Sequence, residues 1–286
     1  MVITGIKEKD LSSTGLKEGR ERFSTVVVIG GANIDIKGKS FGELVKMTSN
    51  PGKVSMALGG VGRNIAHNLA LLGVPVTFLG VVGDDEWGRK ILRETGDAGV
   101  DMEKVKISRK NSSGVYLAIL DEKGEMEVAV SDMKACEEIN VRYIKSKEGV
   151  IRGSKIVVMD TNLPEKSIKY VSKVCSEEGI KLVVEPVSVE KSKKLRKVLN
   201  KIDYITPNLE ELESLAGSGI SGVKINSDKD MKRAVEKLRN KGEGVKNIVL
   251  TLARRGIFLC GEDLDAGRMR ESRNRNKNKG EFISPY

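Results

Sequence analysis

The chain has 286 residues and a mass of 31.2 kDa, enough for one large α/β domain with a small appendage. Hydrophobic residues make up 39% of it and charged residues 31%, which excludes a disordered or fibrous protein. The net charge of +10 comes largely from lysine-rich helix faces such as 191–201 and from the polar segment 268–279. Neither basic segment is interleaved with aromatic residues, so we do not expect nucleic-acid binding.

The cysteines and the single histidine give no sign of a metal centre. Cys136, Cys175 and Cys260 lie far apart, form no CxxC pair, and have only His67 as a further soft ligand. This pattern disfavours zinc and is typical of reduced thiols in a cytosol. No run of about 20 apolar residues occurs, so a membrane span is not expected. The sequence therefore predicts a cytoplasmic protein.

Short apolar runs alternate with amphipathic segments along most of the chain. The apolar runs predict strands at 25–29, 76–82, 156–159, 182–185, 204–206 and 248–252. The 3.6-residue periodicity predicts a helix after 59–62 and further helices at 87–95, 164–176, 189–199, 209–216 and 230–239. Nearly continuous apolar strands between helices indicate an α/β fold, a three-layer sandwich around a mostly parallel sheet.

Two segments interrupt this alternation. Residues 115–120 and 125–130 flank a turn at 121–124 and predict an antiparallel hairpin, whereas 36–54 is interpreted as an irregular insertion. We expect the two insertions, about 36–55 and 113–133, to form a small β-sheet lid on one domain, 23–286. Residues 1–22 are interpreted as a mobile N-terminal arm, and 261–279 as a loop or disordered segment.

A glycine-rich string, Gly59-Gly60-Val61-Gly62-Arg63-Asn64, leads directly into a predicted helix. Glycines allow a ligand to approach the backbone, and a helix N-terminus offers free N–H donors. A tight structural turn explains the string equally well. The string matches neither the dinucleotide-binding fingerprint nor a Walker A loop.

Asn33 and Asp35 follow the first predicted strand, at the position where open α/β sheets bind ligands. Their side chains suit hydrogen bonds to sugar hydroxyls, but both residues also favour turns, and the two interpretations stay open. Asp84 and Asp85 precede a helix and are better explained as N-caps.

Asn208 and Glu211 stand three residues apart at the start of a predicted helix. The spacing fits a capping box, and it also fits the orientation of Mg²⁺-bound water near phosphates. His67 has no partner for metal binding or catalysis and is interpreted as a helix-surface or packing residue.

Several strings in order resemble the ribokinase (PfkB) family of sugar and nucleoside kinases. They are Gly-Gly-Ala-Asn-Ile-Asp at 30–35, Gly-Gly-Val-Gly-Arg-Asn-Ile-Ala at 59–66, Val-Gly-Asp-Asp at 82–85, Pro-Asn-Leu-Glu-Glu at 207–211 and Thr-Leu at 251–252. Within the family, the strings 50–52, 131–133, 160–164 and 185–189 look most like the pseudouridine kinases. The resemblance implies a ribokinase-like fold and transfer of the ATP γ-phosphate to the 5′-hydroxyl of pseudouridine. A kinase for another ribonucleoside or sugar, or a nucleoside-binding protein without turnover, remains an alternative.

The resemblance also implies roles for individual residues. Those at the ribosyl moiety are Asn33, Asp35, Gly60 and Asn64, with Asp132 reaching the nucleoside from the lid. Those at the nucleotide are Asn208 and Thr251, with Glu211 at Mg²⁺. ATP and Mg²⁺ are the implied cofactors, with K⁺ as a further candidate. The implied partners are small molecules and, through the lid, a second copy of the chain.

The sequence departs from the family at three places. Ala253 stands where glycine is usual, and His67 stands where glutamate is common. The sequence also contains no Gly-Ala-Gly-Asp string, the family's catalytic loop, so no catalytic aspartate can be assigned, and the resemblance implies a kinase domain truncated before that loop, with its C-terminal part missing. Because a general base contributes typically about 10²–10⁴-fold, we expect the 286-residue chain to be nearly inactive.

Overall fold

The computed structural model describes residues 26–217, 224–239, 244–266 and 281–283. The expected arm at 1–22 lies outside these residues, as does most of the expected loop at 261–279. Within the described ranges, no helix is long and apolar enough to cross a membrane.

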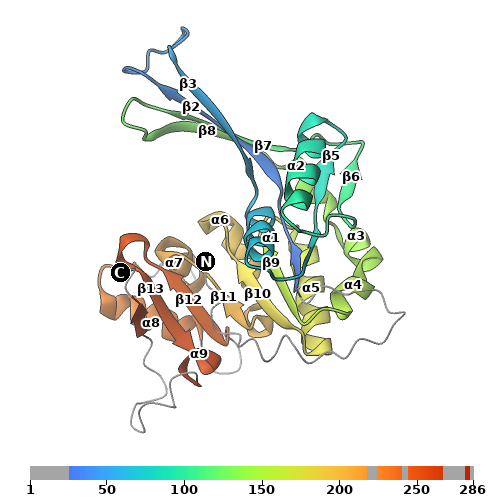
Figure 1. Cartoon of the computed structure of the whole chain (residues 1–286). Helices are drawn as coiled ribbons and strands as arrows, with labels where there is room; N and C mark the ends of the chain where they lie inside the picture. The colour runs from blue at the N-terminus through green and yellow to red at the C-terminus, as the bar shows by residue number, and fades with distance from the viewer. Residues whose placement is uncertain (1–25, 218–223, 240–243, 267–280, 284–286) are drawn as a thin grey trace.

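The centre of the molecule is an eight-stranded sheet (Figure 1). Its order is β14-β13-β12-β11-β10-β9-β1-β4, and all pairs from β4 to β12 are parallel. The strands are β1 (Val26–Ile29), β4 (Val76–Leu79), β9 (Ile156–Asp160), β10 (Lys181–Glu185), β11 (Tyr204–Ile205), β12 (Asn247–Thr251), β13 (Ile257–Gly261) and β14 (Glu281–Ile283). The expected α/β fold with a mostly parallel sheet is confirmed.

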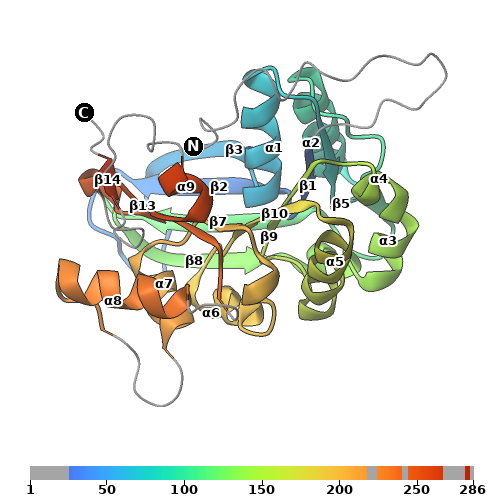
Figure 2. The same ribbon diagram turned by 90° about the horizontal axis from the view of Figure 1, so that it is seen from below.

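Helices cover both faces of this sheet (Figure 2). On one face lie α1 (Val61–Leu71) and α2 (Glu86–Asp97). On the other lie α3 (Val141–Ser146), α4 (Glu148–Arg152), α5 (Glu165–Glu178), α6 (Val189–Ser192), α7 (Leu209–Ala216) and α8 (Asp228–Leu238). A short helix, α9 (Glu262–Ala266), follows β13.

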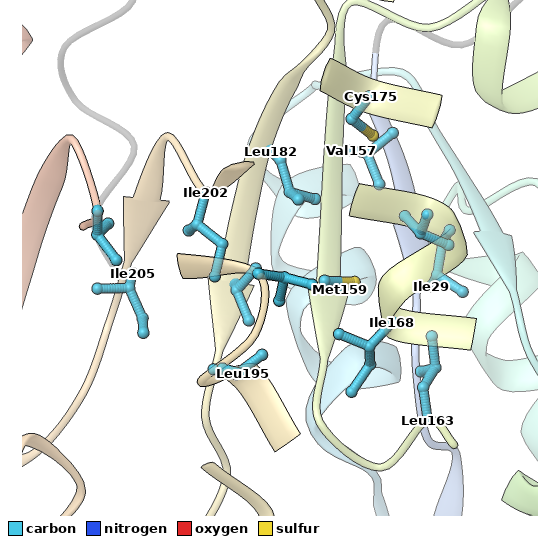
Figure 3. Packing of buried hydrophobic residues seen from close by; sticks show 14 of the residues in the cluster. Ile29, Val157, Met159, Leu163, Ile168, Cys175, Leu182, Leu195, Ile202 and Ile205 are labelled. Atoms are coloured by element: carbon cyan, nitrogen blue, oxygen red, sulfur yellow. The ribbon is translucent and has the colours of Figure 1, made fainter. Parts of the chain in front are cut away.

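Alternate residues of each central strand enter two separate cores. In β1, Val27 and Ile29 pack with α5 residues such as Ile168, whereas Val26 and Val28 pack under α1. Figure 3 shows the first core, where Ile29 lies beside the side chains from β9 and α5. Because both faces of β1 are buried, its sequence is continuously apolar rather than alternating.

A second sheet of four strands, here named the lid sheet, projects from the body (Figure 1). It has the order β3-β2-β7-β8, with β2 (Asn33–Ser40), β3 (Gly52–Gly59), β7 (Gly114–Leu120) and β8 (Met126–Asp132). The expected hairpin is therefore present. The insertion 36–54 joins the same sheet, as expected, and its two ends are regular strands, because β2 and β3 pair in antiparallel register from Asn33–Gly59 to Ser40–Gly52.

Three further expectations need correction. The predicted strand 76–82 breaks at Gly80, and its second half, β5 (Val81–Gly83), pairs with β6 (Lys106–Ser108) in a separate sheet. The predicted helix 189–199 ends as α6 at Ser192 and continues as 3₁₀ turns, since the buried residues Ser192, Leu195 and Val198 recur every third position. The start of the expected loop at 261–279 is instead the end of β13 followed by α9.

Candidate active site

The order of the central sheet reverses direction beside β1. From β1 the chain runs to β4 on one side, and β9 to β12 are added later on the other side. In open parallel sheets, ligands bind in the crevice at the carboxyl ends of the strands at such a switch point. Here Gly30 and Gly31 follow β1, and Asp160 ends β9.

The Asp160 carboxylate links the loop after β1 to the start of α1. Its Oδ2 accepts hydrogen bonds from the backbone N–H groups of Gly31 (2.9 Å) and Gly62 (2.8 Å). Asp160 is completely buried, and burial raises the pKa of its carboxyl while these N–H groups favour the charged form. One side chain of β9 thus fixes the loop after β1 against the first turn of α1.

Gly60 is required by two independent constraints. Its φ of +93° lies in the left-handed region, and a Cβ there would stand 2.4 Å from the carbonyl oxygen of Gly31. The turn therefore brings the string 59–64 against the residues after β1. The tight structural turn is therefore present, and it places the N-terminus of α1 at the crevice, whereas ligand binding by this string stays a prediction.

Asn33 and Asp35 form a hydrogen-bonded pair at the start of β2. Asn33 Nδ2 donates to Asp35 Oδ1 at 2.6 Å, Asn33 is buried, and Asp35 is half-buried. A Cβ on Gly59 would lie 2.4 Å from that Asp35 oxygen, so the neighbouring strand must carry glycine here. The structure thus places the pair in a strand, not in a turn.

Asn64 lies on the first turn of α1 and is exposed. It accepts a hydrogen bond from the buried guanidinium of Arg63, which also donates to the Leu58 carbonyl and contacts His67 Nδ1. Burial lowers the pKa of Arg63, and burial and Arg63 lower that of His67. His67 therefore packs against Arg63, in agreement with its interpretation as a packing residue.

The register places Asp132 away from the Asn33–Asp35 pair. Asp132 is aligned with Val115, and Val115 with Ile34, so these three side chains share one face of the lid sheet. Asp35 lies on the opposite face. Asp132 is exposed, and its Oδ1 accepts from the Lys134 N–H at 3.2 Å.

Two neighbours of Asp132 in the same string stand closer to the pair. Ser131 is aligned with Tyr116, which is aligned with Asp35. The Met133 sulfur would stand 3.0 Å from a Cβ on Gly114, as would Cβ of Asn33.

Asn162 is a crevice residue that the sequence analysis did not single out. Its amide would stand 3.0 Å from a Cβ on Gly31, and its Oδ1 accepts from Lys191 Nζ at 2.6 Å. The string Asp-Thr-Asn-Leu-Pro at 160–164 contained the signal, since polar residues there end a buried strand.

Asn208, Glu211 and Thr251 gather around Pro207 at the ends of β11 and β12. Asn208 caps α7 by accepting from the Glu211 N–H at 2.8 Å, and Glu211 Oε2 accepts from the Asn208 N–H at 3.0 Å. The capping box is therefore present. Thr251 donates to the Pro207 carbonyl through its backbone N–H (2.9 Å) and its hydroxyl (3.3 Å).

A second acid, half-buried, stands between the two groups of residues. Glu185 ends β10 and accepts a hydrogen bond from the Thr206 hydroxyl. Burial raises its pKa to about 7, and the charges of Glu211 and Asp160 act in the same direction. Burial likewise raises the pKa of Glu211. Among the described residues no group of three or more His, Cys, Asp or Glu is arranged as a metal site. One or two carboxylates completed by phosphates and water are nevertheless what Mg²⁺ commonly uses, and Glu185 and Glu211 fit that pattern.

Ala253 occupies a glycine-type conformation. Its φ is +49°, and it lies two residues after the end of β12 and before the turn at Gly256, whose φ is +87°. An L-residue with a Cβ is strained in this region by roughly 1–2 kcal/mol. Alanine in place of the family's usual glycine at position 253 therefore leaves the backbone strained there.

Comparisons with known proteins show the family to which the chain belongs. The model of the pfkB family carbohydrate kinases matches residues 24–271. The chain belongs to this family. The chain is 40% identical to the pseudouridine kinase of Escherichia coli (strain K12) over 197 residues. These residues are 69% of this chain and 62% of that protein. An uncharacterized sugar kinase of the same organism, YeiI, is 33% identical over 258 residues, 89% of this chain and 69% of its own length.

Solved structures show that the fold is ribokinase-like. The structure of Arabidopsis thaliana ribokinase complexed with ribose and ATP matches this pfkB family chain with a TM-score of 0.72. The match covers 91% of this chain and 78% of that one, at 21% sequence identity. The expected family and fold are confirmed. The chain spans less than two thirds of the length of the E. coli pseudouridine kinase that it matches.

Proposed function

We propose that this protein is an ATP-dependent kinase for the 5′-hydroxyl of pseudouridine. The observation that carries the proposal is the hydrogen-bonded Asn33–Asp35 pair, held by Gly59 beside the switch point of the sheet. Paired amide and carboxylate groups can donate to and accept from neighbouring hydroxyls of a ribosyl ring. The 40% identity to a pseudouridine kinase supports the choice of nucleoside.

In this proposal the crevice holds the nucleoside and the far end of the sheet edge holds the nucleotide. Asn33, Asp35, Gly60 and Asn64 bind the ribosyl moiety, and Asn162 joins them from β9. The ends of β1 and β12 are four strand spacings apart, about 19 Å. An extended ATP lying along this edge would direct its γ-phosphate towards the nucleoside.

The nucleotide half rests on Asn208, Glu211 and Thr251. Mg²⁺ held near Glu185 and Glu211 would neutralise phosphate charge, the main requirement of phosphoryl transfer. Thr251 is exposed at the end of β12, where it can line the nucleotide. K⁺ remains a further candidate cofactor, with no observation of its own in the described residues.

Calorimetry on the purified 286-residue chain tests the proposal. Pseudouridine, uridine and ribose are titrated separately, first alone and then with Mg²⁺–ATP present. Pseudouridine is expected to bind most tightly. Equal affinity for all three would replace it with the alternative of a broader ribonucleoside or sugar kinase. The other alternative, nucleoside binding without turnover, is not decided by ADP formation in this experiment, because the 286-residue chain contains no Gly-Ala-Gly-Asp string and is expected to be nearly inactive.

We also propose that the lid sheet covers the crevice with its polar face and binds a second copy of the chain with its other face. The alternation of β3, β7 and β8 places exposed apolar side chains together on that other face. They are Val54, Met56, Leu117, Val128 and Val130, which are 40–73% exposed. Exposed apolar clusters of this kind mark interaction surfaces, and a two-fold dimer uses the same patch on both copies.

Sedimentation of two neighbouring variants tests the dimer. Val130→Lys places a charge on the apolar face, whereas Ser131→Lys places the same charge on the opposite face. The first is expected to sediment as a monomer and the second as the unsubstituted protein does. A monomeric unsubstituted protein, or two variants that behave alike, would contradict the dimer.

A further inference from the structure

The string Val-Gly-Asp-Asp at 82–85 contributes no residue to the nucleoside or nucleotide groups described above. Asp85 is the N-cap of α2, since its Oδ1 accepts from the Gly88 N–H at 2.7 Å. The same carboxylate also accepts two hydrogen bonds from Ser113, from the backbone N–H to Oδ2 and from the hydroxyl to Oδ1, each at 2.7 Å. Helix capping explains the bond from Gly88. It does not explain the two bonds from Ser113, which lies 28 residues further along the chain.

Ser113 stands where the chain enters the lid sheet. It is buried and directly precedes β7, whose first residue, Gly114, is aligned with Asn33 on β2. The Ser113 hydroxyl oxygen in turn accepts from the Gly83 N–H at 2.9 Å. The packing here is tight, because a Cβ on Gly83 would stand 2.3 Å from the Ser113 nitrogen. Asp85 therefore fixes the chain one residue before the partner of Asn33.

Glu138 fixes the chain where it leaves the lid sheet. It ends the 3₁₀ turn η2 (Lys134–Glu138), which begins two residues after the end of β8. Its Oε1 accepts from the Ser108 hydroxyl at 2.5 Å and from Asn111 Nδ2 at 2.6 Å, and its Oε2 accepts from Lys106 Nζ at 2.6 Å. The hydrogen bonds from Lys106 and Ser108 lower the pKa of Glu138 to about 2, so the carboxylate is charged at neutral pH.

The two acids attach both ends of the β7–β8 hairpin to one small unit of the body. Asp85 lies two residues after β5, Glu138 binds side chains of β6, and β5 and β6 pair with each other in a two-stranded sheet. Figure 1 shows this sheet beside the base of the lid sheet. In contrast, β2 and β3 are part of the crevice itself, since Asn33 begins β2 and Gly59 ends β3. The hairpin is joined to them by the pairing of β7 with β2.

We propose that Asp85 and Glu138 are positioning residues that hold the lid sheet in place over the nucleoside crevice. The face of the lid sheet that carries Asp35 also carries Tyr116 and Ser131, which the two acids place opposite the crevice without touching the nucleoside themselves. Loss of either set of hydrogen bonds should let the lid sheet move relative to the body and should weaken nucleoside binding. The inference rests on the proposed function for the identity of the ligand.

Asp85→Asn separates the bonds to Ser113 from the helix cap. Asparagine is as good an N-cap as aspartate and can still accept from Gly88. Its NH₂ group, however, replaces Oδ2 and opposes the Ser113 N–H, so that two donors face each other. Asp84→Asn is the matched control, because Asp84 is the adjacent acid and is exposed.

Three variants test the other acid. Glu138→Ala removes both carboxylate oxygens, whereas Glu138→Gln retains an oxygen that can accept from Ser108 and Asn111. Glutamine loses only the ion pair with Lys106, which is worth little because that lysine is 40% exposed. Glu138→Gln should therefore behave as the unsubstituted chain does. Glu137→Ala is the matched control, because Glu137 is the adjacent acid on η2 and is exposed.

The distance between two spin labels measures the position of the lid sheet without any ligand. Lys123→Cys lies in the turn between β7 and β8 and Lys173→Cys on the exposed face of α5, while the three native cysteines are buried. Labelled chain is diluted in unlabelled chain, so that only distances within one chain contribute. The distance distribution should broaden in Asp85→Asn and Glu138→Ala and should stay unchanged in Glu138→Gln and in the two controls.

Calorimetry with pseudouridine measures the consequence for binding, and thermal unfolding identifies any variant that loses the fold. Asp85→Asn and Glu138→Ala should lose about tenfold in affinity, as expected if the lid sheet is correctly placed about a tenth of the time. Unchanged distance distributions in these two variants would overturn the proposal, and so would broadening without loss of affinity or equal changes in the controls. If the unsubstituted chain binds no pseudouridine, the proposed function fails, and the distances still decide whether the two acids hold the lid sheet.

Discussion

The two groups of site residues at the carboxyl ends of the central strands are held in place in different ways. Around β1 and β9, Asp160 reaches Gly31 and Gly62 across sequence separations of 129 and 98 residues, and glycines leave no space for a side chain. Around β11 and β12, Asn208 and Glu211 satisfy each other within one helical turn. The crevice therefore depends on long-range packing, whereas the nucleotide end depends on local helix capping.

This contrast separates residues that helix capping explains from residues that it does not explain. A capping box needs no ligand to account for Asn208 and Glu211. Helix capping and turn formation do not explain the Asn33–Asp35 hydrogen bond. They also do not explain why the backbone of Gly31 lies so close to Gly60. The crevice is accordingly the stronger evidence for a ligand site, and substitutions there should have the larger effects.

The largest effect is expected for Gly60→Ala. The new Cβ meets the Gly31 carbonyl at 2.4 Å in addition to the backbone strain at φ +93°, so we expect a loss of about 3 kcal/mol or more in the free energy of unfolding. Gly73→Ala is the matched control. Its φ is +77°, but nothing lies within 4 Å of the new Cβ, so only about 1 kcal/mol should be lost. Urea unfolding measures both, and equal losses would show that the crevice is not tightly packed.

The next effect separates the two faces of the lid sheet. Asp35→Asn removes a charged acceptor from the crevice and should weaken pseudouridine binding by about 10–100-fold. Asp132→Asn removes the same charge from the opposite face and should change affinity by less than about twofold. Calorimetry with pseudouridine compares them. A large effect of Asp132→Asn would restore the role that the family resemblance implies for it.

Glu185, between the two ends, predicts a pH dependence of stability. Its pKa rises from 4.5 to about 7 on folding, so the folded state binds a proton that the unfolded state releases between these values. The contribution of Glu185 to the free energy of unfolding should therefore be greatest below about pH 4.5, and it should decrease as the pH rises to 7. Glu185→Gln should make this slope shallower, leaving the part due to Asp160 and Glu211, whose pKa values burial also raises, whereas Glu177→Gln on the exposed face of α5 should leave the slope unchanged. An unchanged slope in Glu185→Gln would contradict the assignment.

The smallest effect concerns the nucleotide end. Ala253→Gly relieves an L-residue at φ +49° and should stabilise the fold by about 1 kcal/mol. Ala70→Gly within α1 should have the opposite sign, with a loss of about 1 kcal/mol. Thermal unfolding of the two variants measures the difference. Destabilisation by Ala253→Gly would mean that this turn is not strained.

The elements that the sequence predicts well are those with local causes. The expected helix 209–216 matches α7 at both ends, because its capping box and apolar spacing are contained within it. The sequence places 36–54 in the lid but does not delimit its strands, because β2 and β3 carry exposed lysines such as Lys37 and Lys53, and their order comes from pairing with each other. Strand β13 was missed because it follows the turn at Ala253–Arg255 in antiparallel direction, against the alternation of the rest.

The site residues can also be separated into those that local sequence identifies and those that only the fold reveals. The sequence identifies Asn33, Asp35 and Gly60 through their strings, and the fold brings them together. It cannot show that Asp160 joins the two strings or that Asn162 lies against Gly31, since the two Asp160 hydrogen bonds alone span 129 and 98 residues of sequence. The face on which Asp132 lies depends on the register of β7 and β8, which no single strand determines.

Hydrogen–deuterium exchange of the 286-residue chain tests the central claim most directly. With pseudouridine, slower exchange is predicted for amides in 30–35, 59–64 and 160–162, with little change in 206–212 and 251–255. Mg²⁺–ATP should produce the reverse pattern. Protection of the second set by pseudouridine, with the first set unchanged, would contradict the assignment of the crevice to the nucleoside.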